Sequence, residues 1–86
     1  LPGKWKAFGW EVMILENGND MDMVVRALEE AKTRTGHGRP ICVLMKTEMG
    51  YGVDFMQGTH HWHGKATNAE QTATALAQLE ETLGDY

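Results

Sequence analysis

The sequence has only one cysteine, Cys42, so the 86-residue chain cannot form an internal disulfide. A chain without disulfides is typical of the reducing cytosol, and we therefore expect a cytoplasmic protein. No apolar run is long enough to span a bilayer and no signal-peptide pattern is present, which argues against a membrane partner. Acidic residues outnumber basic ones by 12 to 8, for a net charge of −4. That charge argues against sequence-independent binding to nucleic acid.

The chain is short, and it starts at Leu1 without an initiator methionine. A chain of this length is one small domain or a piece of a larger one, and it buries a smaller share of its surface than a full-sized domain does. We expect Leu1 to be a cut end and residues 1–86 to form a single partial domain.

The spacing of apolar residues predicts an α/β fold built on a β-α-β unit. The run WEVMIL at 10–15 is rich in strand-forming residues, and a turn follows it. Apolar residues then recur on one helical face over 21–33, where Asn19 or Asp20 can cap the helix. The run ICVLM at 41–45 suits a strand that is buried on both faces of a parallel sheet. Two adjacent parallel strands leave edges that a stable monomer would need to cover, so we expect this unit to have neighbours.

Helices are expected on both sides of this unit in the chain. A short helix is predicted over 2–8, with Pro2 near its first turn and Gly9 ending it. The pattern Thr67-Asn68-Ala69-Glu70 matches a capping box, so a last helix should begin near Asn68. Its apolar stripe is expected to comprise Ala73, Leu76, Leu79 and Leu83.

A long glycine-containing loop over 47–66 follows the second predicted strand, and ligands collect at the carboxyl ends of strands in open α/β sheets. Its histidines at 60, 61 and 63 could bind a metal, although their spacing matches no zinc motif. Gly50-Tyr51-Gly52 could let backbone approach a phosphate beside Lys46, although the third glycine of the dinucleotide fingerprint is missing. The histidines could also be merely solvated, with Trp62 packed down as an anchor for the loop.

Four motifs occur in order along the chain: "KWKAFGWEV", "NGND" ahead of an Ala-Leu-Glu-Glu-Ala-Lys helix, "KTEMGYGV" and "WHGKA". Together they resemble the N-terminal, thiamine diphosphate-binding section of transketolase, specifically its last part. The similarity is to the split bacterial form, in which the N-terminal half is a separate subunit. The resemblance covers essentially all 86 residues and implies a partial thiamine-diphosphate-binding fold.

The resemblance also implies a function. Transketolases use thiamine diphosphate and a divalent metal, here taken as Mg²⁺, to move a two-carbon ketol unit between sugar phosphates. Lys46 matches the family lysine beside the cofactor. His63, before Gly64, matches the histidine that contacts the cofactor and the ketose donor, so it is expected to bind cofactor and substrate and to be catalytic. His60 is expected to have a supporting role, and 50–58 to form a mobile lid.

The family's metal ligands should precede residue 1, so no metal ligand is expected in this chain. The expected partners, in a homo-oligomer, are the remaining transketolase domains or a C-terminal subunit. The isolated chain is expected to be inactive. Two alternatives stay open. One is a non-catalytic α/β binding or assembly module of the same ancestry, and the other is a small histidine-dependent metal-binding module.

Overall fold

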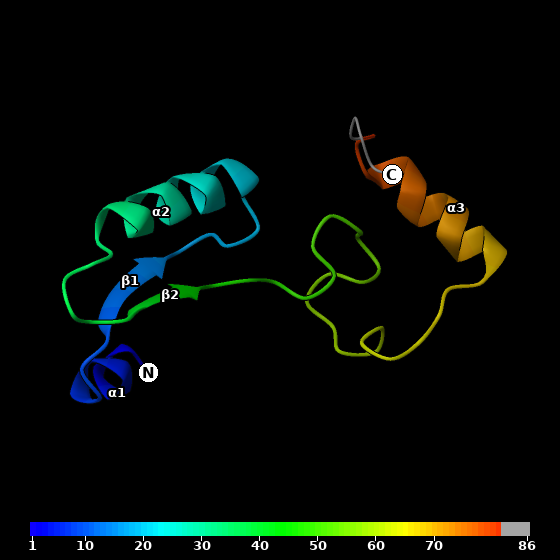
Figure 1. Ribbon diagram of the computed structural model, residues 1–86. Helices are drawn as coiled ribbons and strands as arrows, with labels where there is room; N and C mark the ends of the chain where they lie inside the picture. The colour runs from blue at the N-terminus through cyan, green and yellow to red at the C-terminus, as the bar shows by residue number, and fades with distance from the viewer. Residues whose placement is uncertain (82–86) are drawn as a thin grey trace. The chain divides into compact units, whose positions relative to one another are not determined.

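The computed structural model describes residues 1–81, and the chain divides into two compact units between Thr47 and Glu48. The first unit contains two helices and two strands, and the second, over its described residues 48–81, contains a long turn-rich segment and one helix (Figure 1). The elements in chain order are α1 (Pro2–Ala7), β1 (Glu11–Leu15), α2 (Met21–Thr33), β2 (Ile41–Met45) and α3 (Ala69–Gln78).

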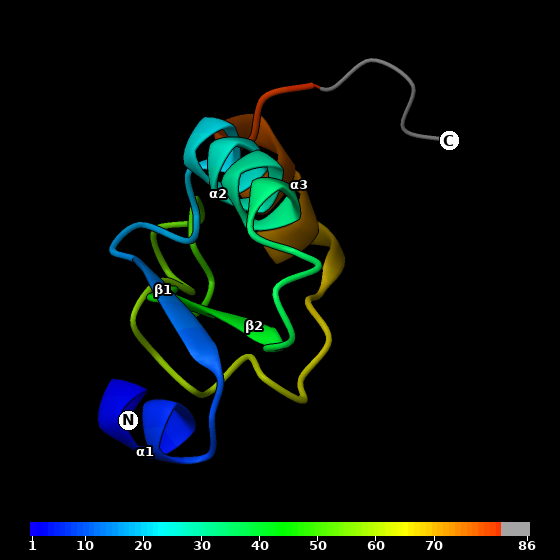
Figure 2. The same cartoon turned by 60° about the vertical axis from the view of Figure 1, so that its left-hand side comes forward.

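The first unit is a parallel β-α-β fragment, as its apolar pattern predicts. Strands β1 and β2 pair in parallel, in a register that runs from Glu11 opposite Ile41 to Leu15 opposite Met45. Helices α1 and α2 lie on opposite sides of this two-stranded sheet (Figure 2). The predicted α/β fold with flanking helices is thereby confirmed.

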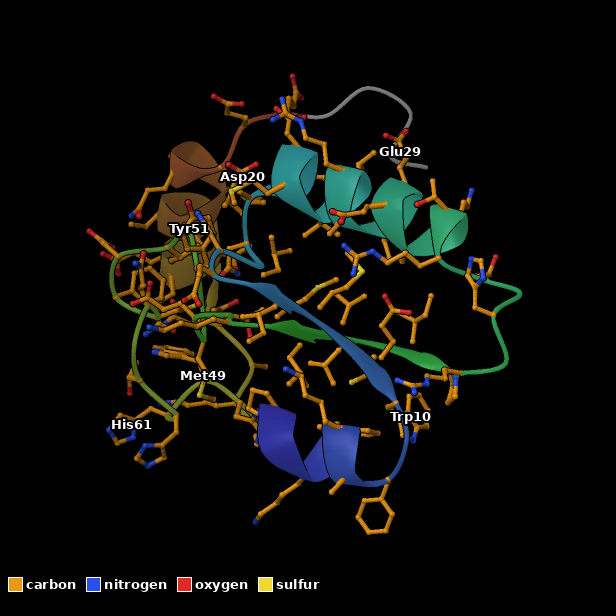
Figure 3. The ribbon with its side chains drawn as sticks, turned by 90° about the vertical axis from the view of Figure 1, so that its left-hand side faces the viewer. Trp10, Asp20, Glu29, Met49, Tyr51 and His61 are labelled. Atoms are coloured by element: carbon orange, nitrogen blue, oxygen red, sulfur yellow. The ribbon has the colours of Figure 1, made fainter. Side chains whose placement is uncertain are left out.

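Side chains at both ends of α2 form contacts that fix the helix in the first unit. Asp20, one of the two predicted caps, accepts a hydrogen bond from the Met23 amide at 3.2 Å and lies at the start of the helix (Figure 3). At the other end, the Arg34 guanidinium forms ion pairs with Glu30 and, at 3.1 Å, with Glu11 at the start of β1. The hydrogen bonds to Glu30 and then Glu11 raise the pKa of Arg34. The same guanidinium therefore links the C-terminal end of the helix to the sheet.

The sheet is less buried than the apolar run of β2 predicts. Every residue of β2 is half-buried, so the prediction of a strand buried on both faces is wrong for this chain. Within residues 1–81, the buried hydrophobic residues are Leu15, Val53 and Ala75, at 6 to 9% exposure. Ile14 in β1 is 58% exposed. The reason is that a two-stranded sheet with a single helix on each side, one of them short, has too few neighbours to enclose it.

The second unit begins with turns from 48 to 65 that contain no helix or strand, and it continues into α3. Helix α3 begins with a capping box in which the Asn68 side chain accepts from the Gln71 amide at 2.8 Å. The Gln71 side chain in turn accepts from the Asn68 amide at 3.0 Å. The predicted box of Thr67 with Glu70 is thus displaced by one residue. Helix α3 ends at Gln78, and Leu83 of the predicted stripe lies outside the described residues.

Candidate functional site

Lys46 follows β2 directly, at the carboxyl end of the parallel sheet where the sequence places it. Its backbone is held from two directions. The Lys46 amide donates to the Leu15 carbonyl at 2.9 Å, and the Lys46 carbonyl accepts from the Gly18 amide at 2.7 Å. Its side chain is exposed and forms no ion pair or hydrogen bond within residues 1–47. A fixed backbone with an unengaged ammonium group suits an anion-binding role.

The chain after Lys46 closes into a loop with a narrow base. The Gly58 amide donates to the Met49 carbonyl at 2.9 Å, and the Gln57 side chain donates to Glu48 at 2.9 Å. We call these two hydrogen bonds the neck of the loop. Inside it, tight turns link Gly50, Val53 and Met56 through hydrogen bonds of 3.0 to 3.2 Å. The loop is therefore an ordered structure with its own hydrogen bonds.

Helix α3 holds the tip of this loop. The Asp54 amide donates to the Gln78 side chain at 2.8 Å, and the Gln78 amide group donates back to the Asp54 carboxylate at 3.0 Å. Val53, beside Asp54, is buried. Opening of the predicted lid over 50–58 would have to break this paired contact, and the lid's mobility stays a prediction.

Other atoms of the same chain lie close to the two glycines of Gly50-Tyr51-Gly52, on the side where a side chain would stand. A Cβ on Gly50 would lie 2.4 Å from the Met56 carbonyl oxygen, and a Cβ on Gly52 would lie 3.0 Å from Leu79 Cδ2. Both have positive φ, which glycine adopts without strain. The open side of each glycine is thus occupied by protein. On that side of Gly50 the backbone of Met56 therefore stands where the G-x-G pattern suggested close approach of a phosphate.

Trp62 anchors the following turn, as expected. Its indole N–H donates to the Phe55 carbonyl at 3.1 Å, and the two rings pack edge to face with centroids 5.3 Å apart. The Lys65 ammonium lies 5.1 Å from the centre of the Trp62 ring, within range of a cation–π interaction. These contacts hold the residues on either side of His63.

His63 lines a hollow of about 230 Å³ in the second unit. The His63 amide donates to the His60 carbonyl at 3.1 Å, while its side chain is exposed. The other residues lining the hollow are Met49, Gly50, Met56, Thr59 and Trp62. An apolar wall with one imidazole at its surface can contact part of a ligand and donate to an anionic oxygen.

The remaining loop histidines form a separate pair. The rings of His60 and His61 stack with centroids 4.8 Å apart, and neither residue lines the hollow. Figure 3 shows His61 at the outer edge of the loop, pointing away from the ribbon. Among residues 1–81, no group of three histidine, cysteine or acidic side chains is arranged to hold a metal ion. The three-histidine metal module is therefore not supported.

Lys46 belongs to the first unit and His63 to the second. Each is exposed and available to a ligand within its own unit. That the two converge on one ligand stays a prediction. Sequence reasoning missed Gly18, which contacts the backbone of Lys46. The turn that contains Gly18 was recognised, but its contact with the end of β2 depends on strand pairing, which the turn pattern does not encode.

Comparison with known proteins defines the chain more narrowly than its geometry does. A parallel β-α-β unit is the repeating unit of open α/β folds, in which ligands bind at the carboxyl ends of the strands. The family described as "Transketolase, thiamine diphosphate binding domain" matches residues 1–84. The chain belongs to this family. The predicted partial thiamine-diphosphate-binding fold is confirmed by this match together with the parallel sheet.

Three curated relatives are similar over nearly the whole chain. Transketolase 1 of Aliivibrio fischeri is 38% identical over 85 residues, which are 99% of this chain and 12% of that protein. A 6-deoxy-6-sulfo-D-fructose transketolase subunit of a Clostridium species is 36% identical over 81 residues, 94% of this chain and 28% of the subunit. An apulose-4-phosphate transketolase subunit of Actinobacillus succinogenes is 36% identical, also over 81 residues, with the same coverage. The chain thus spans about an eighth of the first relative and just over a quarter of the other two.

Within residues 1–81, none of the helices is both long and apolar enough to cross a membrane.

Proposed function

We propose that this chain supplies part of the thiamine diphosphate site of a transketolase-type enzyme, which transfers a two-carbon ketol unit between sugar phosphates. The family match over residues 1–84 carries this proposal. The residues also fit one part of the cofactor, its diphosphate, because Lys46 offers a free cation at a strand end and His63 offers an imidazole beside a hollow. Thiamine diphosphate, when bound, supplies the electron sink that stabilises a carbanion.

Lys46 is proposed to bind the diphosphate. Its ammonium is compact and strongly hydrated, and its strand-end backbone is fixed by Leu15 and Gly18. Such an anchored cation neutralises part of the diphosphate charge at little cost in backbone ordering. His63 is proposed to donate to a diphosphate oxygen and to hold or move a proton at the oxygen atoms of the ketose substrate. Both roles require a side chain that is exposed beside the hollow, as His63 is.

The size of the hollow supports an incomplete site. Pockets that enclose a whole small molecule usually measure roughly 300–1,000 Å³, and the hollow beside His63 measures about 230 Å³. A hollow of this size contacts only part of such a cofactor, which supports a site that other protein completes. We propose that the remaining transketolase domains or a C-terminal subunit complete the site in a cytoplasmic homo-oligomer, and that Mg²⁺ ligands lie outside residues 1–86. In this proposal, residues 1–86 are the C-terminal segment of a diphosphate-binding N-terminal subunit. The 28% coverage of two transketolase subunits supports only the part of the proposal that makes the chain a segment of a longer protein.

The isolated 86-residue chain is expected to have no ketol-transfer activity. It offers one lysine and one histidine toward the proposed site, and the metal ligands and the other cofactor-binding groups are proposed to lie outside it. Activity is measured with thiamine diphosphate, Mg²⁺ and a ketose phosphate donor, for the chain alone and for the chain joined to the missing segments of a transketolase. Turnover by the chain alone would contradict the proposal. A purified chain that unfolds cooperatively as a defined oligomer, and stays inactive when completed, would favour the non-catalytic assembly module.

Replacing Lys46 with alanine in the completed enzyme is expected to weaken thiamine diphosphate binding about 10- to 100-fold. Loss of a hydrogen bond to a charged group costs about 1.5–3 kcal/mol, and each 1.4 kcal/mol is a factor of ten. The dissociation constant is measured by titrating the apoenzyme with cofactor at saturating Mg²⁺. Lys32→Ala, which removes an exposed lysine in the last turn of α2, is the matched control and should leave the dissociation constant unchanged. Equal affinities of Lys46→Ala and the parent enzyme would remove Lys46 from the site.

A further inference from the structure

The turn after β1 contacts the end of β2 through a glycine. The Asn17 side chain accepts from the Asn19 amide at 3.2 Å and shapes the turn, and Asp20 caps α2 directly after it. Between them, the Gly18 amide donates to the Lys46 carbonyl at 2.7 Å. We propose that Gly18 is a positioning residue for Lys46, acting by close contact with the backbone that carries the lysine side chain. This inference rests on the proposed cofactor-binding role of Lys46.

Space explains why this position must be glycine. A Cβ on Gly18 would lie 2.8 Å from Met45 Cβ, 2.9 Å from Thr47 Cγ2 and 3.1 Å from the Lys46 carbonyl oxygen. Real Cβ atoms essentially never come within 3.0 Å of another heavy atom in this way. Gly18 is not among the glycines with positive φ, so backbone conformation is not the reason. The missing side chain is what allows the turn to approach the strand end.

The three atoms that a Cβ would meet surround Lys46 in the chain. Met45 Cβ and the Lys46 carbonyl oxygen move only with their backbone, so they cannot rotate aside as the end of a long side chain would. An alanine at position 18 therefore pushes on the strand end or breaks the 2.7 Å hydrogen bond. Either change moves the Cα of Lys46, and with it the side chain that carries the ammonium group. Gly18 itself has no side chain to offer a ligand, so its effect must pass through Lys46.

The test is a double-mutant cycle in the completed enzyme, with thiamine diphosphate as the probe. Gly18→Ala is expected to raise the dissociation constant of thiamine diphosphate about 10-fold. The kcat at saturating cofactor should stay within about twofold, because a displaced Lys46 weakens cofactor binding and does not touch the reacting atoms. In a Lys46→Ala background, Gly18→Ala is expected to raise the dissociation constant by less than about a further twofold. The reason is that the effects of two substitutions acting through the same contact do not add. Gly3→Ala is the matched control, since a Cβ there meets nothing within 4 Å, and it should leave binding unchanged.

The outcomes separate this inference from the proposed function. If Lys46→Ala leaves the dissociation constant unchanged, the proposed role of Lys46 fails, and the positioning role fails with it. Suppose instead that Lys46→Ala weakens binding. If Gly18→Ala then leaves the dissociation constant unchanged, or raises it by the same factor with and without Lys46, only the positioning role is overturned. Should Gly18→Ala fail to assemble, Gly18→Ala with Thr47→Ser removes the Cγ2 methyl group and relieves one close contact. If this double variant also fails to assemble, the proposal is overturned, because Gly18 would then be required for folding and not for the position of Lys46.

Discussion

Replacing His63 with alanine is expected to lower kcat/KM for ketol transfer about 100-fold or more in the completed enzyme. General acid–base groups contribute roughly 10²–10⁴-fold to rate, and His63 is the histidine that lines the hollow of the second unit. The change removes an exposed imidazole whose side chain makes no hydrogen bond within 48–81, so folding should be little affected. The measurement is steady-state kinetics with varied ketose phosphate at saturating thiamine diphosphate, followed by cofactor titration of the same variant.

His61→Ala is the matched control for this prediction. His61 lies two residues away, is exposed, stacks on His60 and does not line the hollow. Its replacement should change kcat/KM by less than about twofold, as expected for a surface position away from the reacting atoms. Full activity of His63→Ala would remove the catalytic role. Similar losses in both variants would indicate that the loop as a whole, and not the His63 side chain, supports the reaction.

Replacing Gly50 with alanine is expected to destabilise the loop by about 3 kcal/mol. A non-glycine residue at a φ of +66° is strained, and its Cβ would lie 2.4 Å from the Met56 carbonyl oxygen. Backbone strain and overpacking each cost about 1–3 kcal/mol. The loop must then open, so chymotrypsin should cleave after Tyr51 or Phe55 much faster than in the parent protein. Cleavage rates of the folded protein and its melting temperature measure the effect.

Gly36→Ala separates the two causes. Gly36 has a similar positive φ of +83°, but a Cβ on it meets nothing within 4 Å. Its replacement should therefore carry the conformational cost alone, about 1 kcal/mol. If Gly36→Ala and Gly50→Ala lower the melting temperature equally, close packing against Met56 makes no contribution. A larger loss for Gly50→Ala identifies that packing as the main reason for glycine in the loop.

Local sequence signals predicted the elements of the first unit well. The bounds of α2 and β2 agree with their apolar runs because glycines and a proline stand between them as clear stops. The capping box of α3 was displaced by one residue for a similar local reason. Thr67 and Asn68 are both good caps, and Glu70 and Gln71 are both suitable partners, so the pattern alone does not choose between the two registers.

Burial and contacts between distant residues were harder to predict. The apolar composition of β2 indicates a strand for a covered sheet, yet coverage depends on neighbours that a single run of residues does not specify. Lys46 and His63 became candidates through family resemblance, since isolated loop residues of these types are often merely solvated. The contacts of Gly18 with 45–47 and of Gly50 with Met56 depend on the folded path of the chain. Neither contact has a sequence signature beyond the presence of glycine.

The neck of the loop has a consequence for how such a protein can diversify. Because Gly58 bonds to Met49 and Gln57 to Glu48, the chain leaves the loop beside the point where it entered. Exposed side chains of the loop, such as Tyr51, can therefore be exchanged while the neck keeps the course of the flanking backbone. Natural variation or directed evolution at such exposed positions can then alter the surface of the loop without moving the contacts of Trp62 that precede the imidazole.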